Sequence, residues 1–138
     1  MGTNAEQPPH FLNVDLDLES TAPLDALIAG FDPGAFALHR DALEIRQQAL
    51  TYVASLELTT EAPTADACIA AFCTLVEGFD ATARDAWFAC AVRCFDIGLE
   101  SGAHGKALVL DLAPEALRRS LALGATIRVT LYSIANDG

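Results

Sequence analysis

Three acidic side chains occupy every second position of one short segment. Residues 10 to 20 read HFLNVDLDLES, in which Asp15, Asp17 and Glu19 alternate with apolar residues. Gathered carboxylates bind divalent cations, and paired carboxylates act as general acid and base. On a β-strand, residues two apart point to the same face, with their Cα atoms about 7 Å apart. Two of these carboxylates could converge on one ion, whereas three from one straight strand could not.

The same alternation is typical of a half-buried strand with its acidic side in water. Cross-strand charge pairs would then neutralise the acids and contribute about 0.2 to 1 kcal/mol each. Asp96 alternates with apolar residues in FDIGLES, and Arg128 and Tyr132 lie on the outward face of the last strand pattern, TIRVTLYSI. The sequence predicts one polar sheet face, solvated or used for a ligand or partner, with the residues Asp15, Asp17, Glu19, Asp96, Arg128 and Tyr132.

Four cysteines, Cys68, Cys73, Cys90 and Cys94, fall in segments with a helical pattern. Cys90 and Cys94 would lie one helical turn apart, so their thiols could share a face. Structural zinc sites typically use short C-x-x-C spacings, and this spacing is absent. Free cysteines are among the most buried residues. We therefore predict four core residues, with no metal ligand and no cofactor.

The three histidines are scattered near strand ends and turns. A histidine beside a carboxylate could act as a general base. The corresponding hypothesis is a small metal-dependent hydrolase that uses Asp15, Asp17 or Asp96 with His39 or His104. The segment 100–107, ESGAHGKA, departs from the phosphate-binding loop, because Glu100 replaces its first glycine and Ala107 follows the lysine.

The chain carries 19 acidic and 8 basic residues, a formal net charge of −11. Nucleic-acid binding needs lysine and arginine to replace the counterions of phosphates, so we expect no nucleic-acid partner, and anionic membranes are disfavoured. The same charge favours a cation or a basic protein partner. No apolar run approaches the roughly 18 residues of a membrane span. The first residues lack a signal pattern, so we expect a cytoplasmic protein with reduced thiols.

The periodicity changes along the chain in a way that separates strands from helices. Period two predicts strands over 11–20, 35–39, 49–59, 95–101 and 126–134, with 106–112 as the returning arm of a hairpin. Helical spacing predicts a short helix within 20–34, capped by Ser20 or Thr21, two helices over 63–77 and 81–95, and another over 113–124. The segment 40–48 is left unassigned. We expect Ile127, Val129 and Leu131 to face inward.

Alternating strands interspersed with helices favour an α+β fold. We predict a two-layer domain, an antiparallel or mixed sheet with helices packed on one face, and a ferredoxin-like arrangement as an option for its first elements. Residues 1–9, which end in two prolines, are expected to form a flexible N-terminal arm, and residues 10–138 a single domain.

Three segments, HFLNVDLDLES, AWFACAVRCFDIGLES and LAPEALRRSLALGATIRVTLY, resemble small uncharacterised bacterial proteins of the domain-of-unknown-function type. The resemblance implies a bacterial cytoplasmic α+β domain and carries over no functional residues. Our leading hypothesis is a non-enzymatic domain that binds a protein or ligand through its acidic sheet face. The alternatives are the metal-dependent hydrolase and a toxin-neutralising or adaptor protein that binds a basic partner.

Overall fold

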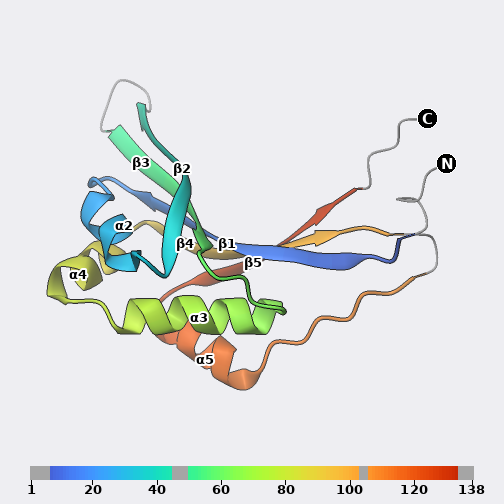
Figure 1. The fold of residues 1–138 in the computed structure, drawn as a ribbon. Coiled ribbons are helices and arrows are strands. Elements are labelled where there is room, and N and C mark those ends of the chain that lie inside the picture. Colours follow the sequence, from blue (N-terminus) through green and yellow to red (C-terminus); the bar gives the residue numbers. More distant parts are fainter. Residues whose placement is uncertain (1–6, 45–49, 103–105, 134–138) are drawn as a thin grey trace.

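In the computed structural model, which describes residues 7–44, 50–102 and 106–133, five strands form one mixed sheet in the order β2-β3-β1-β4-β5 (Figure 1). The strands are β1 (His10–Ser20), β2 (Ala35–Glu44), β3 (Leu50–Leu58), β4 (Val92–Glu100) and β5 (Thr126–Tyr132). The helices are α2 (Asp25–Phe31), α3 (Ala65–Glu77), α4 (Ala81–Ala89) and α5 (Pro114–Ala122). The predicted α+β class with a mixed sheet is confirmed.

Strand β1 is the centre of the sheet and pairs antiparallel with both β3 and β4. Strand β2 pairs antiparallel with β3, and β5 runs parallel to β4 at the opposite edge. From β1 to β4 the elements follow the β-α-β-β-α-β order of a ferredoxin-like unit, with both α3 and α4 in the second crossover. Helix α5 and strand β5 extend this unit by one parallel strand.

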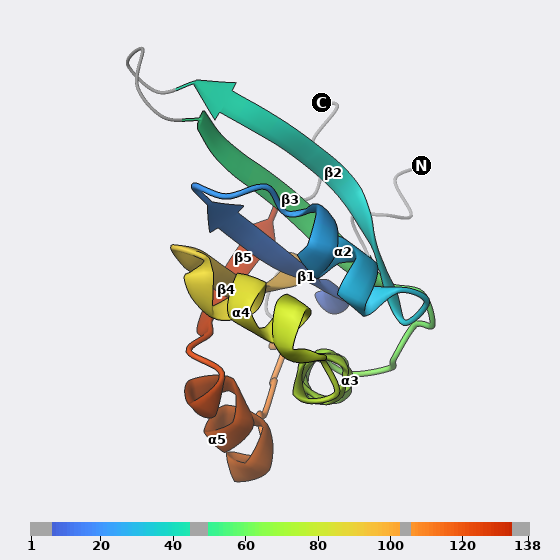
Figure 2. The same cartoon turned by 90° about the vertical axis from the view of Figure 1, so that its left-hand side faces the viewer.

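The apolar positions of β1 face the helices and start the core. Val14, Leu16 and Leu18 are buried, as are Phe72 of α3 and Trp87 of α4. Helices lie along one side of the sheet (Figure 2), so the period-two pattern of each strand sorts its side chains into a helix side and an open side. Burial of a large apolar side chain contributes about 1.5 to 3 kcal/mol, which makes this layer the main source of stability.

Two helix starts agree with the capping pattern, and one does not. The Thr64 and Asp80 side chains accept hydrogen bonds from backbone N–H groups at the starts of α3 and α4. The predicted cap of the first helix by Ser20 or Thr21 is wrong, because α2 begins at Asp25 without a side-chain cap. Ser20 is instead the last residue of β1, where its buried hydroxyl accepts from the N–H of Ala22.

The predicted helix 81–95 is also wrong in its second half. Helix α4 ends at Ala89, and β4 begins at Val92 and pairs with β1. Apolar residues in a short run fit a buried helix or a buried strand equally well, and pairing with the central strand decides the outcome. Cys90 and Cys94 therefore do not share one helical face.

The Arg93 side chain caps the C-terminal end of α4. Its guanidinium donates to the carbonyl oxygens of Trp87, Phe88 and Cys90 at 3.1, 3.3 and 2.8 Å, and its Nε donates to Gly124 O at 3.1 Å. Gly124 has a φ of 69°, and a Cβ there would lie 2.8 Å from the guanidinium. One side chain thus satisfies the last carbonyls of a helix and anchors the turn that leads into β5.

Two other expectations need correction. Residues 106–112 contain no strand and run past the sheet to α5 (Figure 1), where Asp66 accepts from the N–H of Ala113 at 2.7 Å. Strand β2 is longer than the predicted 35–39, and its hydrogen bonds to β3 account for the first part of the unassigned segment 40–48. Most of the predicted arm, residues 1–6, and His104 lie outside the described residues.

The apolar side chains of the last strand all point to the helix side, but they differ in burial. Ile127 packs against the core, whereas Val129 and Leu131 are 58% and 62% exposed although they point to the helix side. Their register partners Ile97 and Leu99 lie on the same side of β4, with Leu99 only partly buried. The predicted direction of the three side chains agrees with this register, but of the three only Ile127 packs against the core. None of the described helices packs against Val129 and Leu131, which leaves them exposed.

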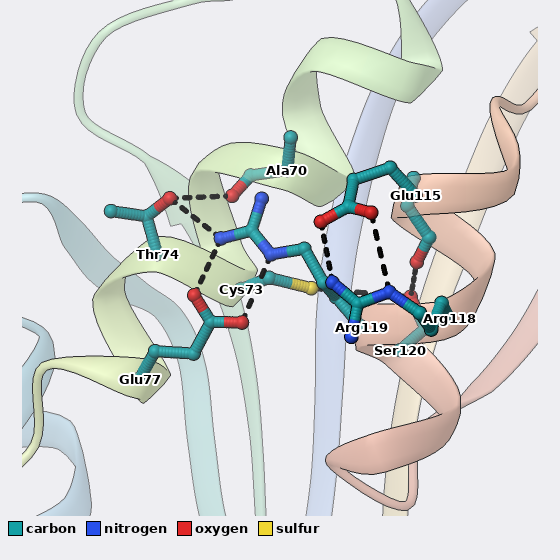
Figure 3. Close-up of polar contacts among 9 residues, drawn as sticks. Ala70, Cys73, Thr74, Glu77, Glu115, Arg118, Arg119 and Ser120 are labelled. Atoms are coloured by element: carbon teal, nitrogen blue, oxygen red, sulfur yellow. Dashed lines mark hydrogen bonds and ion pairs between the residues drawn. The ribbon is translucent and has the colours of Figure 1, made fainter.

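Helix α5 is attached to α3 by a two-pronged ion pair (Figure 3). The Arg119 guanidinium donates to both carboxylate oxygens of Glu77, at 2.9 and 2.6 Å, and to the Thr74 hydroxyl at 2.9 Å. Arg118, its neighbour in sequence, pairs with Glu115 within α5 and is exposed. Of these two arginines, Arg119 is therefore the one that links two helices. Among the described residues, no helix is long and apolar enough to cross a membrane.

We expect Arg93→Ala to lower the free energy of unfolding by about 2 kcal/mol, because several carbonyl groups lose a charged donor. Urea unfolding followed by circular dichroism measures the change. Arg84→Ala is the matched control, because both arginines lie over the Phe88 ring but only Arg93 holds these carbonyls. Equal losses from the two substitutions would contradict this role.

We expect Arg119→Ala to lower the free energy of unfolding by about 1 kcal/mol, through the loss of the bidentate link between α3 and α5. Arg118→Ala removes the same charge from the adjacent position and should leave the urea midpoint unchanged within error. A similar midpoint shift for both variants would show that net charge, and not the link between helices, is what matters.

Candidate functional site on the open face of the sheet

The acidic ladder lies on the side of the sheet that the helices leave uncovered, which we call the open face. Asp15 is the direct register partner of Asp96 on β4, and Asp17 is the partner of Ser55 on β3 and Cys94 on β4. Asp96 is in turn the partner of Arg128 on β5. The topology thus brings together acids separated by about 80 positions in the sequence.

Arg128 bridges two of these acids. Its Nη1 lies 3.3 Å from Asp17 Oδ2 and 3.6 Å from Asp96 Oδ2. The other oxygen of each carboxylate accepts from a hydroxyl, Ser55 Oγ to Asp17 Oδ1 at 2.9 Å and Thr130 Oγ1 to Asp96 Oδ1 at 2.7 Å. Asp17 and Asp96 are therefore held in place by charge and by hydrogen bonds.

Asp15 lies beside this group, but no basic side chain among the described residues forms an ion pair with it. Its carboxylate accepts from the Asn13 amide at 2.9 Å, and no ion pair reaches it from any residue the structure describes. Burial raises the pKa of the Asp15 carboxyl, and the negative charges of Glu57, Asp17 and Asp96 raise it further, to about 6. Near neutral pH this face carries a carboxylate that the fold does not neutralise.

A shallow hollow of about 220 Å³ opens on the same face, above Ser55 and Val53 of β3. It is lined by three acidic residues, Asp17, Glu19 and Asp41, and by the basic or titratable residues His39, Arg40 and Arg128. Pockets for small organic ligands typically measure about 300 to 1,000 Å³. This hollow has the size for one long side chain and not for a drug-sized molecule.

The predicted site residues all lie on the open face, but they do not form one cluster. Asp15, Asp17, Asp96 and Arg128 are neighbours, as the register shows. Glu19 borders the hollow. Tyr132 pairs with Glu100 at the far end of β5, about 13 Å along the strand from Arg128. Tyr132 is therefore outside the central group.

The hydrolase hypothesis requires His39 or His104 to converge with the acids in one pocket. Asp17 and His39 both line the hollow, whereas His104 lies outside the described residues. His39 is on β2 opposite Ser55, and Asp17 is opposite Ser55 on the other side. The hydroxyl of Ser55 donates to Asp17, so the serine lies between the acid and the histidine. In a catalytic triad the histidine lies between the serine and the acid. The order here is not that of a triad.

The described residues contain no group of three or more His, Cys, Asp or Glu side chains with the geometry of a metal site. Asp15, Asp17 and Asp96 share a face, yet Arg128 occupies the space between two of them. The four cysteines are buried and free, and burial raises the thiol pKa of Cys68, Cys73 and Cys90. These thiols pack as core residues, as predicted from the sequence.

Sequence reasoning missed several members of this face. Ser55, Thr130 and Asn13 hold the carboxylates, and Glu57 raises the pKa of Asp15. Their polar positions in alternating strands give a signal for the open side. Strand order was the information needed to place them beside the acids.

Comparison with protein-family models, with curated proteins and with solved structures finds no match to this chain. The resemblance to uncharacterised bacterial proteins therefore stays a prediction.

We expect Asp15→Asn to raise the free energy of unfolding by about 1 to 2 kcal/mol at pH 7.5, because it removes a charge that the folded state disfavours. The raised pKa means that the stabilising neutral form is fully present below about pH 4 and is lost as the pH rises through about 6. The gain should thus shrink as the pH falls and vanish near pH 4.

Urea unfolding at several pH values from 4 to 7.5 measures this dependence. Glu19→Gln is the matched control on the same strand and face, and we expect it to change stability little at any pH. A gain from Asp15→Asn that is the same at all pH values would contradict the role of charge.

Proposed function

We propose that this chain is a non-enzymatic binding domain that presents its open sheet face to a basic protein partner. The observation that carries the proposal is the hollow on this face, which is lined by the acids Asp17, Glu19 and Asp41. Its two arginines, Arg40 and Arg128, already pair with Asp25 and Asp17, so Glu19 and Asp41 keep their charges. The uncompensated carboxylate of Asp15 lies on the same face. A partner that brings a lysine or arginine would neutralise charge that the fold leaves in place.

The size of the hollow favours a side chain of a protein over a free ligand. An arginine guanidinium matches a carboxylate with two parallel hydrogen bonds, so arginine is the preferred occupant over lysine. The flat strands around the hollow would contact the rest of the partner. A toxin-neutralising or adaptor role would use the same surface.

The test is the affinity for an arginine octapeptide, measured by isothermal titration calorimetry. We expect Asp15→Asn with Asp17→Asn to weaken binding at least tenfold, about 1.4 kcal/mol. The fold should be retained, since the amide oxygen introduced at position 17 still accepts from the Ser55 hydroxyl. The control is Asp85→Asn with Asp111→Asn, which removes the same charge from exposed positions elsewhere.

An equal loss of affinity in the control variant would show that net charge alone attracts the peptide, and would contradict the proposed site. Thermal unfolding with Ca²⁺, Mg²⁺ or Mn²⁺, and after chelation, tests the alternative that the open face binds a divalent cation. A saturable shift that the Asp15 and Asp17 substitutions abolish would replace the protein-partner proposal with a metal site.

A further inference from the structure

The free edge of β5 differs from the other edge of the sheet. Strand β2 has a register shift between Ala37 and His39 and carries the charged residues Arg40 and Asp41. Bulges and edge charges are the usual devices that prevent strand pairing between molecules. Strand β5 keeps a continuous register with β4 from Thr126 to Tyr132 and contains neither proline nor lysine. Its one charged residue, Arg128, is paired with Asp17 and Asp96 on the open face. Of the two edge strands described, only β2 thus combines a register shift with unlike charges.

The hydrogen bonds of β5 to β4 show which of its backbone N–H and C=O groups point to the free edge and could pair with another strand. Ser101 N donates to Tyr132 O at 2.8 Å, so the peptide groups of Tyr132 face β4. Because successive residues of a strand alternate in direction, those of Thr130 and Arg128 also face β4. The N–H and C=O groups of Ile127, Val129 and Leu131 consequently point away from the sheet, along its free edge.

The side chains beside these groups are apolar and exposed. Val129 and Leu131 are 58% and 62% exposed on the helix side of the strand. An added strand would cover them and would also pair the free backbone groups. Both features are therefore explained by one additional strand along β5.

The charge distribution indicates a second copy of this chain as the source of that strand. Any two copies repel, because each carries a net charge of −11. Residues 116–133 are the exception, with three arginines and no acid. Arg119 and Arg128 are neutralised by acids elsewhere in the same chain, and Arg118 by Glu115 of α5. Two copies can thus approach along the edge of β5 without bringing unpaired charges of residues 116–133 together.

We propose that two copies form a symmetric dimer by antiparallel pairing of their β5 strands, centred on Val129. In this register Val129 faces its counterpart and Ile127 faces Leu131 of the second copy. The three residue pairs would exchange about six backbone hydrogen bonds and join the sheets into one. The open faces would lie side by side on the joined sheet, so the dimer leaves the proposed partner surface free.

Sedimentation velocity over a range of protein concentrations tests the proposal. We expect a species of about twice the 14.6 kDa chain mass. Salt should favour the dimer, because it screens the repulsion between copies, whereas it should weaken arginine-peptide binding to the open face. The two proposals can therefore fail independently.

Val129→Pro is the decisive variant. Proline at this position removes an N–H that points away from β4, so the internal ladder remains intact while the intermolecular bond is lost. We expect this variant to sediment as a single chain with an unchanged circular dichroism spectrum. Val129→Thr keeps both the N–H and the branched side chain, and should remain dimeric. Should Val129→Pro not fold, Val129→Lys with Leu131→Lys alters only exposed side chains and serves instead.

Amide hydrogen exchange gives an independent readout. In a dimer the N–H groups of Ile127, Val129 and Leu131 become protected as the concentration rises, while those of Arg128 and Thr130 are protected throughout. A single-chain mass at all concentrations, or a dimer that persists in folded Val129→Pro, would overturn the proposal.

Discussion

The packing of one row of β1 against the helices is the interaction on which the rest of the structure depends. Val14, Leu16 and Leu18 are almost completely buried, and β1 pairs with strands on both of its sides. A shift of β1 by one residue would exchange its buried and open rows, so the burial of these three residues fixes the register of β3 and β4 as well. That register therefore determines where the acidic side chains of β1 and β4 lie on the open face.

Covering only one side of a sheet has an electrostatic consequence. When strands that alternate apolar and acidic residues bury their apolar side chains on one face, their acidic side chains gather on the other face. Asp15, Asp17 and Asp96 come from β1 and β4, and Arg128 of β5 compensates two of them. The remaining repulsion appears as the raised pKa of Asp15. An acidic face made in this way costs some folding stability, and under the proposed function it would attract a cationic partner.

The two proposed interaction surfaces use different properties of the same sheet. The open face offers side-chain charge and a hollow, whereas the edge of β5 offers backbone hydrogen-bonding groups and apolar contacts. Pairing of two β5 edges would double the acidic surface without using any of its carboxylates. Two linked faces can bind a bivalent partner more tightly than either face alone.

The sequence by itself determined the class of fold and the polarity of each strand face. Alternation in HFLNVDLDLES and FDIGLES is a local property, and the hydrophobic effect acts on it in the same way in any sheet. It also correctly indicated cysteines as core residues. It misassigned residues 90–95 and 106–112, where short apolar runs suit more than one local structure and long-range pairing makes the choice.

Only the tertiary structure decided which polar residues meet. Asp17 and Arg128 are far apart in the chain, and no periodicity states that β4 lies between β1 and β5. Ser55 and Thr130 became partners of the acids through strand order, and Val129 is exposed because none of the described helices covers it. Local patterns fix which side of a strand faces water, since that choice depends on the residue alone. The neighbours on that side depend on the path of the whole chain.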